Sequence, residues 1–422
     1  MLLTIIAIIF VLGYVAIALE HTIKISKTAR ALSLGTLLWL IWFKFSGDLN
    51  LANEQLFECF GELTQIIFFL MGAMTIVAIV DANDVFSIIT SRIKTNNART
   101  LMWLIAWLTF FLSAVLDNLT TTIVMMTLMR KLIEDSKMRL YLAGIIIIAA
   151  NAGGAWSPIG DVTTAMLWIG GQVSTIGIIK TLILPSMVSL LVPLIILNFL
   201  IKGKIKYDLQ ITTQAPPSFE RNAIFAAGIG GLLMVPVINT IFHVPPYIAM
   251  LFTLGFLWTA VESIGKKYNP VPQRLSTYQV IKEVDMPSVL FFAGILLAVG
   301  VLNATGQLAS LAGILENSIG NTNIIIAILG ALSAVVDNVP MAAATMKMYS
   351  LSNYPQDDFL WKFIAFCIGT GGSMLVIGSA AGVAAMGIDR NLSFGWYLRK
   401  ITPLAVLGYA SGAILTIFLT TT

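Results

Sequence analysis

The chain of 422 residues is 58% hydrophobic and 11% charged, and it carries a formal net charge of +4 at pH 7. Soluble domains carry about twice that share of charged residues, so the composition excludes an ordinary soluble protein. Two cysteines are too few for a disulfide framework or a cysteine-based metal cluster. We expect an all-α polytopic membrane protein whose positive loops face anionic lipid rather than nucleic acid, and no pattern indicates a cofactor.

Long apolar runs recur along the chain, each close to the roughly 20 residues that a helix needs to cross a bilayer. Uninterrupted crossings are predicted at residues 2–19, 31–46, 63–80, 175–201, 222–242, 246–264, 286–304 and 401–420. Two regions, 100–170 and 322–388, do not fit this scheme. Each holds an Asp-Asn pair inside an apolar run, followed by a second run that glycines interrupt.

We predict that each Asp-Asn pair marks the tip of a re-entrant hairpin, at 101–130 and 322–350. The segments 140–170 and 360–388 then each cross once, with a break in the middle. If the N-terminus lies outside, the cytoplasmic loops hold 21 of the 25 Lys and Arg residues. Cytoplasmic loops carry this bias in membrane proteins. Treating the first hairpin as a full crossing would instead move the basic loop 130–139 outside.

Three segments recur in the same order at nearly constant offsets, which predicts an internal repeat. They are SAVLDNL (113–119) with SAVVDNV (333–339), 68–83 with 290–305, and GGAWSPIGD (153–161) with GGSMLVIGS (371–379). The predicted units are 1–210 and 211–422, each with five transmembrane helices, one re-entrant hairpin and one broken helix. An odd number of crossings inverts the second unit, and inverted repeats with broken helices are typical of secondary transporters.

Two acidic residues of the first unit lie at membrane depth, where a carboxylate costs several kcal/mol and usually marks an ion or proton path. Asp117 follows the first apolar run, and Asp161 follows a helix broken by glycines and Pro158. The alternative for both residues is a purely structural role as the N-cap of the helix that follows. Carboxylate, amide and hydroxyl oxygens suit a hard cation. The candidate cation- and proton-binding residues are Asp117, Asn118, Asn151, Ser157, Asp161, Thr163 and Thr164.

The second unit keeps the Asp-Asn pair, but Ser379 stands where the first unit has Asp161. Its candidate site residues are Ser333, Asp337, Asn338, Thr370, Ser373 and Ser379. We therefore expect uneven sites, with the acids concentrated in the first unit. Burial and like-charge neighbours favour the protonated form of a carboxylate. A proton and a small cation would then compete for the same oxygens, which couples their fluxes in opposite directions.

The chain resembles the NhaD-type sodium/proton antiporters of the ion transporter superfamily. The matching strings are LDNLTTTIVM (116–125), NAGGAWSPIGDVTTAMLW (151–168), VVDNVP (335–340) and GTGGSMLVIGSAAG (369–382). The resemblance implies exchange of cytoplasmic Na⁺, and of Li⁺, for external H⁺ in a bacterial inner membrane. It also implies an elevator-like motion and a homodimer. The polar positions of the family correspond here to Ser113, Asp117, Asn118, Asn151, Asp161, Thr163, Thr164, Ser333, Asn338 and Ser373.

On this interpretation, Asp117 and Asp161 alternately bind the transported Na⁺ and a proton, and the protein is not an enzyme. Alternatives remain open. A transporter of the same fold could carry an organic anion or arsenite, although the Asp-Asn tips argue against an anion. An intramembrane aspartyl protease would use Asp117 and Asp161 but would leave the repeat unexplained. A channel differs from a transporter only in its kinetics.

Overall fold

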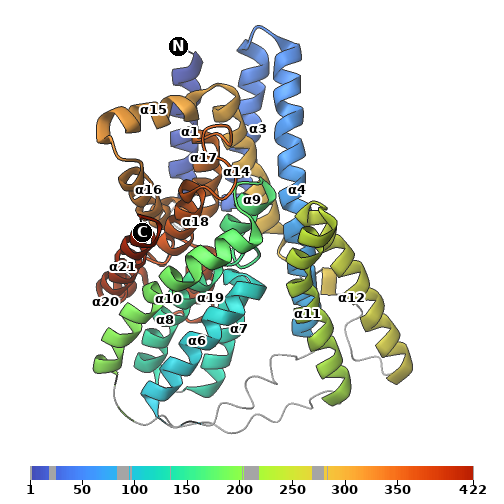
Figure 1. The fold of residues 1–422 in the computed structure, drawn as a ribbon, viewed down its shortest axis with the longest axis vertical. Coiled ribbons are helices and arrows are strands. Elements are labelled where there is room, and N and C mark those ends of the chain that lie inside the picture. The colour runs from blue at the N-terminus through green and yellow to red at the C-terminus, as the bar shows by residue number, and fades with distance from the viewer. Residues whose placement is uncertain are drawn as a thin grey trace.

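The computed structural model describes residues 2–18, 25–82, 95, 97–133, 135–201, 203, 218–268, 280–282 and 284–421. The sequence also predicts cytoplasmic loops at 81–100, 202–221 and 265–283, and most of their residues lie outside the described ranges. The elements within the described ranges are helices (Figure 1). In chain order they are α1 (Leu2–Ala18), α3 (Lys27–Phe45), α4 (Leu49–Ala82), α6 (Ala98–Leu116), α7 (Asn118–Leu132), α8 (Ser136–Gly154), α9 (Val162–Ile169), α10 (Thr175–Leu200), α11 (Ser218–Phe242), α12 (Pro246–Tyr268), α14 (Met286–Ala304), α15 (Gln307–Ile319), α16 (Thr322–Val336), α17 (Asn338–Met348), α18 (Phe359–Gly371), α19 (Ala380–Ile388), α20 (Phe394–Lys400) and α21 (Thr402–Thr421).

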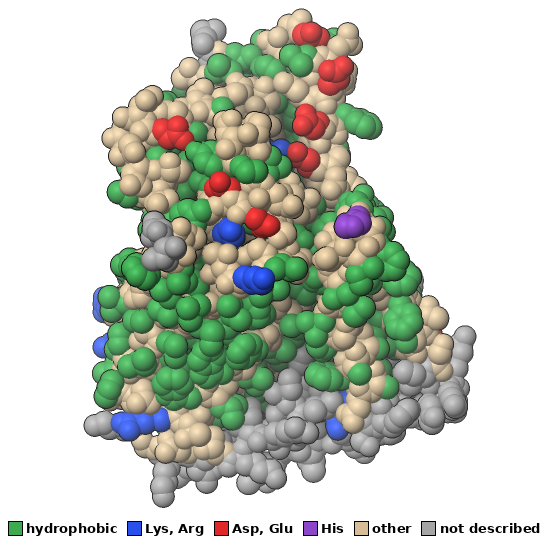
Figure 2. All heavy atoms as spheres, in the orientation of Figure 1, with side chains coloured by type: hydrophobic (Ala, Val, Ile, Leu, Met, Phe, Trp, Pro, Cys, Tyr) green, Lys and Arg blue, Asp and Glu red, His purple; other side chains and the backbone are tan. Residues whose placement is uncertain are grey.

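Six of the described helices are long and apolar enough to cross a membrane, or seven if the bent pair α15 and α16 is counted as one span. Apolar side chains form a broad band across the face shown in Figure 2, and acidic side chains gather at its upper end. These features confirm a multi-pass membrane protein. Fewer described helices are long enough to cross the membrane than the sequence predicts as crossings. Part of the reason is that two of the predicted crossings are split into shorter helices, one into α8 and α9 and the other into α18 and α19.

Helix α4 is longer than the crossing predicted at 63–80, because it begins at Leu49 and runs for 34 residues. At 1.5 Å per residue its length is about 50 Å, whereas the hydrocarbon core of a bilayer is about 30 Å thick. Its first half carries the exposed residues Glu54, Glu58 and Glu62. The acidic half therefore projects into water while the apolar half crosses the membrane.

The helices pack in two groups. Helices α1, α3, α4, α11, α12 and α14 form one, the scaffold group, and α6 to α10 with α16 to α21 form the other, the core group. Helix α15 contacts α14 as well as α16 and α17, and so belongs to neither group. Small residues bring helices close in both, as is common between membrane helices. A Cβ at Gly35 would overlap the Gly294 carbonyl between α3 and α14, and one at Gly408 would overlap the Ser189 carbonyl between α21 and α10. The groups meet where α17 packs on α14 and α9 on α4.

Candidate functional site

Each of the two helical hairpins turns at an aspartate. Asp117 separates α6 from α7, Asp337 separates α16 from α17, and both have φ of 76°. Residues other than glycine rarely adopt this backbone, at a cost of about 1–3 kcal/mol. The carboxylate of Asp117 accepts hydrogen bonds from the backbone N–H (2.8 Å) and the hydroxyl (2.9 Å) of Thr120. That of Asp337 accepts the N–H of Val339 at 3.4 Å. Both acids cap the helix that follows.

The two broken helices lie against these hairpins at glycines. In the first, a Cβ at Gly153 would overlap the backbone of α6, and one at Gly160 would lie 2.8 Å from the Ser113 carbonyl. In the second, a Cβ at Gly371 would overlap the backbone of α16, and one at Gly378 would lie 2.5 Å from a carbonyl of the same helix. Glycine is needed at these positions because backbone meets backbone directly.

A buried cluster of polar side chains lies between the breaks and the hairpin tips. Its centre is Asp161, which accepts hydrogen bonds from the amide of Asn118 (3.1 Å) and from that of Asn338 (3.1 and 3.4 Å). Asn151 joins the cluster through Asn118 (3.4 Å) and donates to the hydroxyl of Ser379 (3.1 Å). The five side chains are at most 3% exposed. The cluster thus combines predicted residues from both halves of the chain.

Asp161 is held differently from the other acids. It occupies the N-cap position of α9, yet its side chain forms no capping hydrogen bond, whereas Ser379 caps α19 through the N–H of Gly382. Its donors from Asn118 and Asn338 are neutral amides, which cannot cancel the charge of an ionised carboxylate. A buried charge is costly unless it is paired. The carboxylate is therefore suited to take up one positive charge, either a cation or a proton.

The other predicted residues lie around this cluster. Thr163 is fully buried, two residues after Asp161. Thr120, which holds Asp117 through two hydrogen bonds, was not among the predicted site residues. Its position three residues after a candidate N-cap was the available signal. Six hydroxyls donate to main-chain carbonyl oxygens and so brace the hairpins and breaks: Ser113 to Ala150, Ser157 to Ala114, Thr164 to Asp161, Ser333 to Gly330, Thr370 to Phe366 and Ser373 to Thr370.

A cavity of about 660 Å³ opens between the scaffold helices α4 and α14 and the core helices α9 and α17. Its lining includes Met166 and Ile169 of α9, the helix that follows Asp161. An ion pair in its wall joins the two groups, with Lys347 Nζ 2.6 Å from Glu62 Oε1. Among the described residues, no three His, Cys, Asp or Glu side chains form a metal-ligand set.

The sequence profile of the family described as citrate transporter matches residues 1–361. The chain is 44% identical over 410 residues to "Sodium/proton antiporter 1" of Arabidopsis thaliana, covering 96% of this chain and 70% of that protein. It is 42% identical over 414 residues to "Sodium/proton antiporter 2" of the same plant, with coverage of 96% and 97%. It is also 30% identical over 444 residues to the Na(+)/H(+) antiporter NhaD of Vibrio cholerae serotype O1, with coverage of 97% and 90%.

The apolar helices and these matches define a multi-pass membrane transporter, not an enzyme, which excludes the protease alternative. The chain belongs to the citrate transporter family and, within it, to the relatives of the NhaD-type antiporters. The family expected from the sequence strings is thereby confirmed.

Proposed function

We propose that the chain is a secondary antiporter that exchanges cytoplasmic Na⁺, and Li⁺, for external protons, with Asp117 and Asp161 as its cation- and proton-binding acids. The observation that carries the proposal is the carboxylate of Asp161, buried in the core group and held by neutral amides from both halves of the chain. Relatives named as sodium/proton antiporters align with 96–97% of the chain and support Na⁺ and H⁺ as the exchanged ions.

The donor set of the cluster suits a monovalent cation. It offers one carboxylate together with amide and hydroxyl oxygens, and divalent cations are usually bound by more acidic sets. An ionised Asp161 with no cation would leave a buried charge unpaired, so the site holds either Na⁺ or a proton. Because one excludes the other, export of the cation is coupled to import of the proton.

An anionic substrate is the competing proposal, since the family is described as citrate transporter. Anions bind readily at helix N-termini, where free N–H groups and the helix dipole favour negative charge. The N-termini of α7 and α17 at the hairpin tips are capped by the carboxylates of Asp117 and Asp337. An approaching anion would meet these carboxylates instead of free N–H groups. The capped tips therefore favour a cation.

We infer that residues 1–210 and 211–422 are inverted copies of one unit, each with five transmembrane helices, a hairpin and a broken helix. Both hairpins turn at an aspartate with the same φ, and both broken helices approach their hairpin at glycines. Asp161 and Ser379 occupy the same N-cap position after the two breaks. This correspondence supports a pseudo-symmetric fold with a single ion site, in which the first half contributes the carboxylate of Asp161 and the second half the hydroxyl of Ser379.

Alternating access would follow from movement of the core group against the scaffold group, with the cavity beside Glu62 and Lys347 as the external route. We also propose that the N-terminus lies outside, as the distribution of Lys and Arg predicts, and that the protein acts as a homodimer, as the resemblance to the NhaD-type antiporters implies. The relatives come from plants and bacteria. The proposal therefore applies to any membrane with an inward proton gradient, including the bacterial inner membrane predicted from the sequence.

Purified protein in proteoliposomes with an imposed ΔpH tests the proposal. A fluorescent dye reports ΔpH while Na⁺, Li⁺, K⁺ or citrate is added in turn. Na⁺ and Li⁺ are expected to dissipate ΔpH, and citrate and K⁺ to leave it unchanged. Because protons compete for the site, lowering the pH should raise the Na⁺ concentration at half-maximal response. A response to citrate with none to Na⁺ or Li⁺ would refute the proposal.

A further inference from the structure

Each short helix that follows a break packs mainly against the other half of the chain. Helix α9, which follows Asp161, contacts α17 and α18 of the second half. Helix α19, which follows Ser379, contacts α7 and α8 of the first half. The positions of Asp161 and Ser379 therefore depend on how the two halves are held together, and the far end of each short helix shows how this is done.

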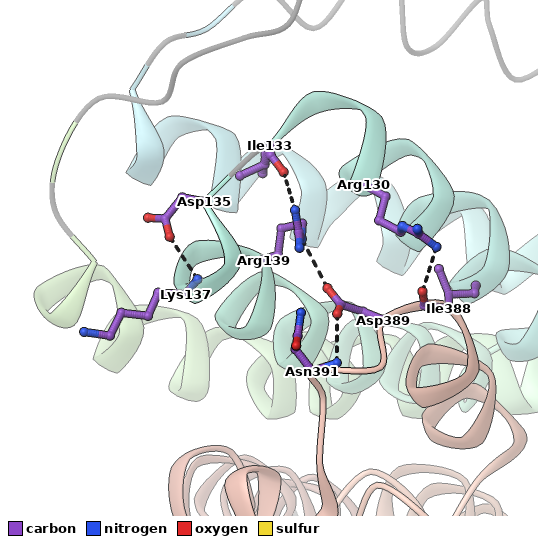
Figure 3. Close-up of polar contacts among 8 residues, drawn as sticks. All are labelled: Arg130, Ile133, Asp135, Lys137, Arg139, Ile388, Asp389 and Asn391. Carbon is purple, nitrogen blue, oxygen red and sulfur yellow. Dashed lines mark hydrogen bonds and ion pairs between the residues drawn. The ribbon is translucent and has the colours of Figure 1, made fainter.

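The end of α19 is tied to the start of α8 (Figure 3). Arg139, in the first turn of α8, forms an ion pair with Asp389, the residue after α19, at 3.2 Å between Nε and Oδ2. The Asp389 side chain is only 4% exposed. Arg139 also donates to the carbonyl of Ile133 after α7 (3.0 Å), and Arg130 of α7 donates to the carbonyl of Ile388 in α19 (2.9 Å). Three elements thus meet at one ion pair.

The connection between α9 and α10 is tied in an equivalent place to the loop before α18, with contacts at Gln172 and at Ser174, the N-cap of α10. Asp357 in that loop accepts the backbone N–H of Ser174 at 2.8 Å, and its own N–H donates to the carbonyl of Gln172 at 2.9 Å. Asp357 has φ of 63°, a left-handed backbone that Asp and Asn adopt more readily than other non-glycine residues. A Cβ at Gly177 would overlap the Asp357 carboxylate, so this glycine leaves room for it.

We propose that these two contacts, the Arg139–Asp389 clasp and the Asp357–Ser174 clasp, position the short helices and stay closed throughout transport. In both, the segment at the start of one broken helix holds the segment that directly follows the broken helix of the other half. The second clasp holds the connection just after α9, which ends at Ile169. Because α9 has only eight residues, about 12 Å, a displacement of that connection is carried along a short, stiff helix toward Asp161. The clasps are positioning contacts for the ion site, and the inference rests on the proposed antiport.

The first experiment asks whether a clasp stays closed. In a chain with Cys59 and Cys367 replaced, Arg139→Cys is combined with Asp389→Cys, and the two thiols are joined by a reducible bifunctional thiol reagent long enough to span the ion pair that it replaces. The matched pair, Glu62→Cys with Lys347→Cys, joins the scaffold group to the core group. Cross-linking is expected to let Na⁺-dependent proton exchange of the clasp pair continue, with half-saturating Na⁺ no higher than before cross-linking, and to stop exchange of the matched pair. Exchange that stops when the clasp pair is cross-linked and returns on reduction would overturn the inference.

The second experiment separates positioning from folding. Asp357→Ala and Gly177→Ala are expected to raise the Na⁺ concentration at half-maximal exchange by about tenfold, because small displacements of site groups are costly. Asp357→Asn keeps the acceptor oxygen and tolerates positive φ, so it should match wild type. Arg139→Asp alone and Asp389→Arg alone should each raise the Na⁺ concentration at half-maximal exchange. Combining the two changes reverses the ion pair and should return this concentration toward the wild-type value.

A purely structural role would instead lower the amount of folded protein and the maximal rate together, at unchanged half-saturating Na⁺, and this result would overturn the inference. Failure of the proposed function looks different, because wild-type protein would then exchange no cation. In that case the rate at which the same bifunctional thiol reagent bridges each pair decides. The clasp pair is expected to be bridged faster than the matched scaffold-to-core pair, and equal rates contradict a closed clasp.

Discussion

Replacing Asp161 with asparagine removes the carboxylate at the centre of the cluster and keeps the size of the side chain. The wild-type carboxylate accepts from both Asn118 and Asn338. An amide offers one acceptor oxygen and turns its NH₂ group toward the other donor, so one hydrogen bond is lost. A cation and a carboxylate about 4 Å apart attract by about 4 kcal/mol at an effective dielectric constant of 20, which corresponds to roughly a thousandfold in affinity.

We therefore expect Asp161→Asn to show no Na⁺-dependent proton exchange at concentrations that saturate the wild type. Folding should not suffer, because the change removes a buried charge. Thermal unfolding followed by tryptophan fluorescence should give a Tm at or above that of the wild type. The control is Asp48→Asn, the same chemical change at a residue that accepts the N–H of Asn50 before α4. Wild-type half-saturation in Asp161→Asn would refute this account of the site.

Three further predictions concern a hairpin tip, a broken helix and the cavity wall. Asp117→Asn should keep the cap and the folded amount but lose exchange, whereas Asp117→Ala should also lower stability by about 1 kcal/mol in thermal unfolding. Gly153→Ala should destabilise the protein by about 1–3 kcal/mol, while Gly255→Ala, with nothing within 4 Å of the new Cβ, should unfold like wild type. Lys347→Gln should change stability by less than about 1 kcal/mol, because its ion pair with Glu62 is partly exposed. The same change should speed Na⁺ capture at low salt only, since about 0.15 M salt screens charges beyond roughly 8 Å; stopped-flow ΔpH measurements check this.

Local patterns in the sequence were sufficient for the class of protein and for the main points where helices break. Apolar runs predict crossings because a helix satisfies its own backbone in lipid. Asp117 and Asp337 were visible because each caps the helix that directly follows it, and the glycines of the breaks were visible because they interrupt an apolar run. The packing alone revealed that these glycines also touch the hairpin backbones. The start of α4 was missed because Glu54, Glu58 and Glu62 interrupt the apolar run without interrupting the helix.

Only the tertiary structure decided which candidates meet. In the sequence, Asp117 and Asp161 looked alike as acids at membrane depth. In the structure, Asp117 caps the helix that follows it, whereas Asp161 accepts hydrogen bonds from the side-chain amides of residues 43 and 177 positions away. The clasp between Arg139 and Asp389 joins residues 250 positions apart. No local pattern encodes such contacts, because they depend on how whole helices pack against one another. The sequence by itself therefore determined the kind of protein and its candidate residues, and the packing of the two halves determined the site.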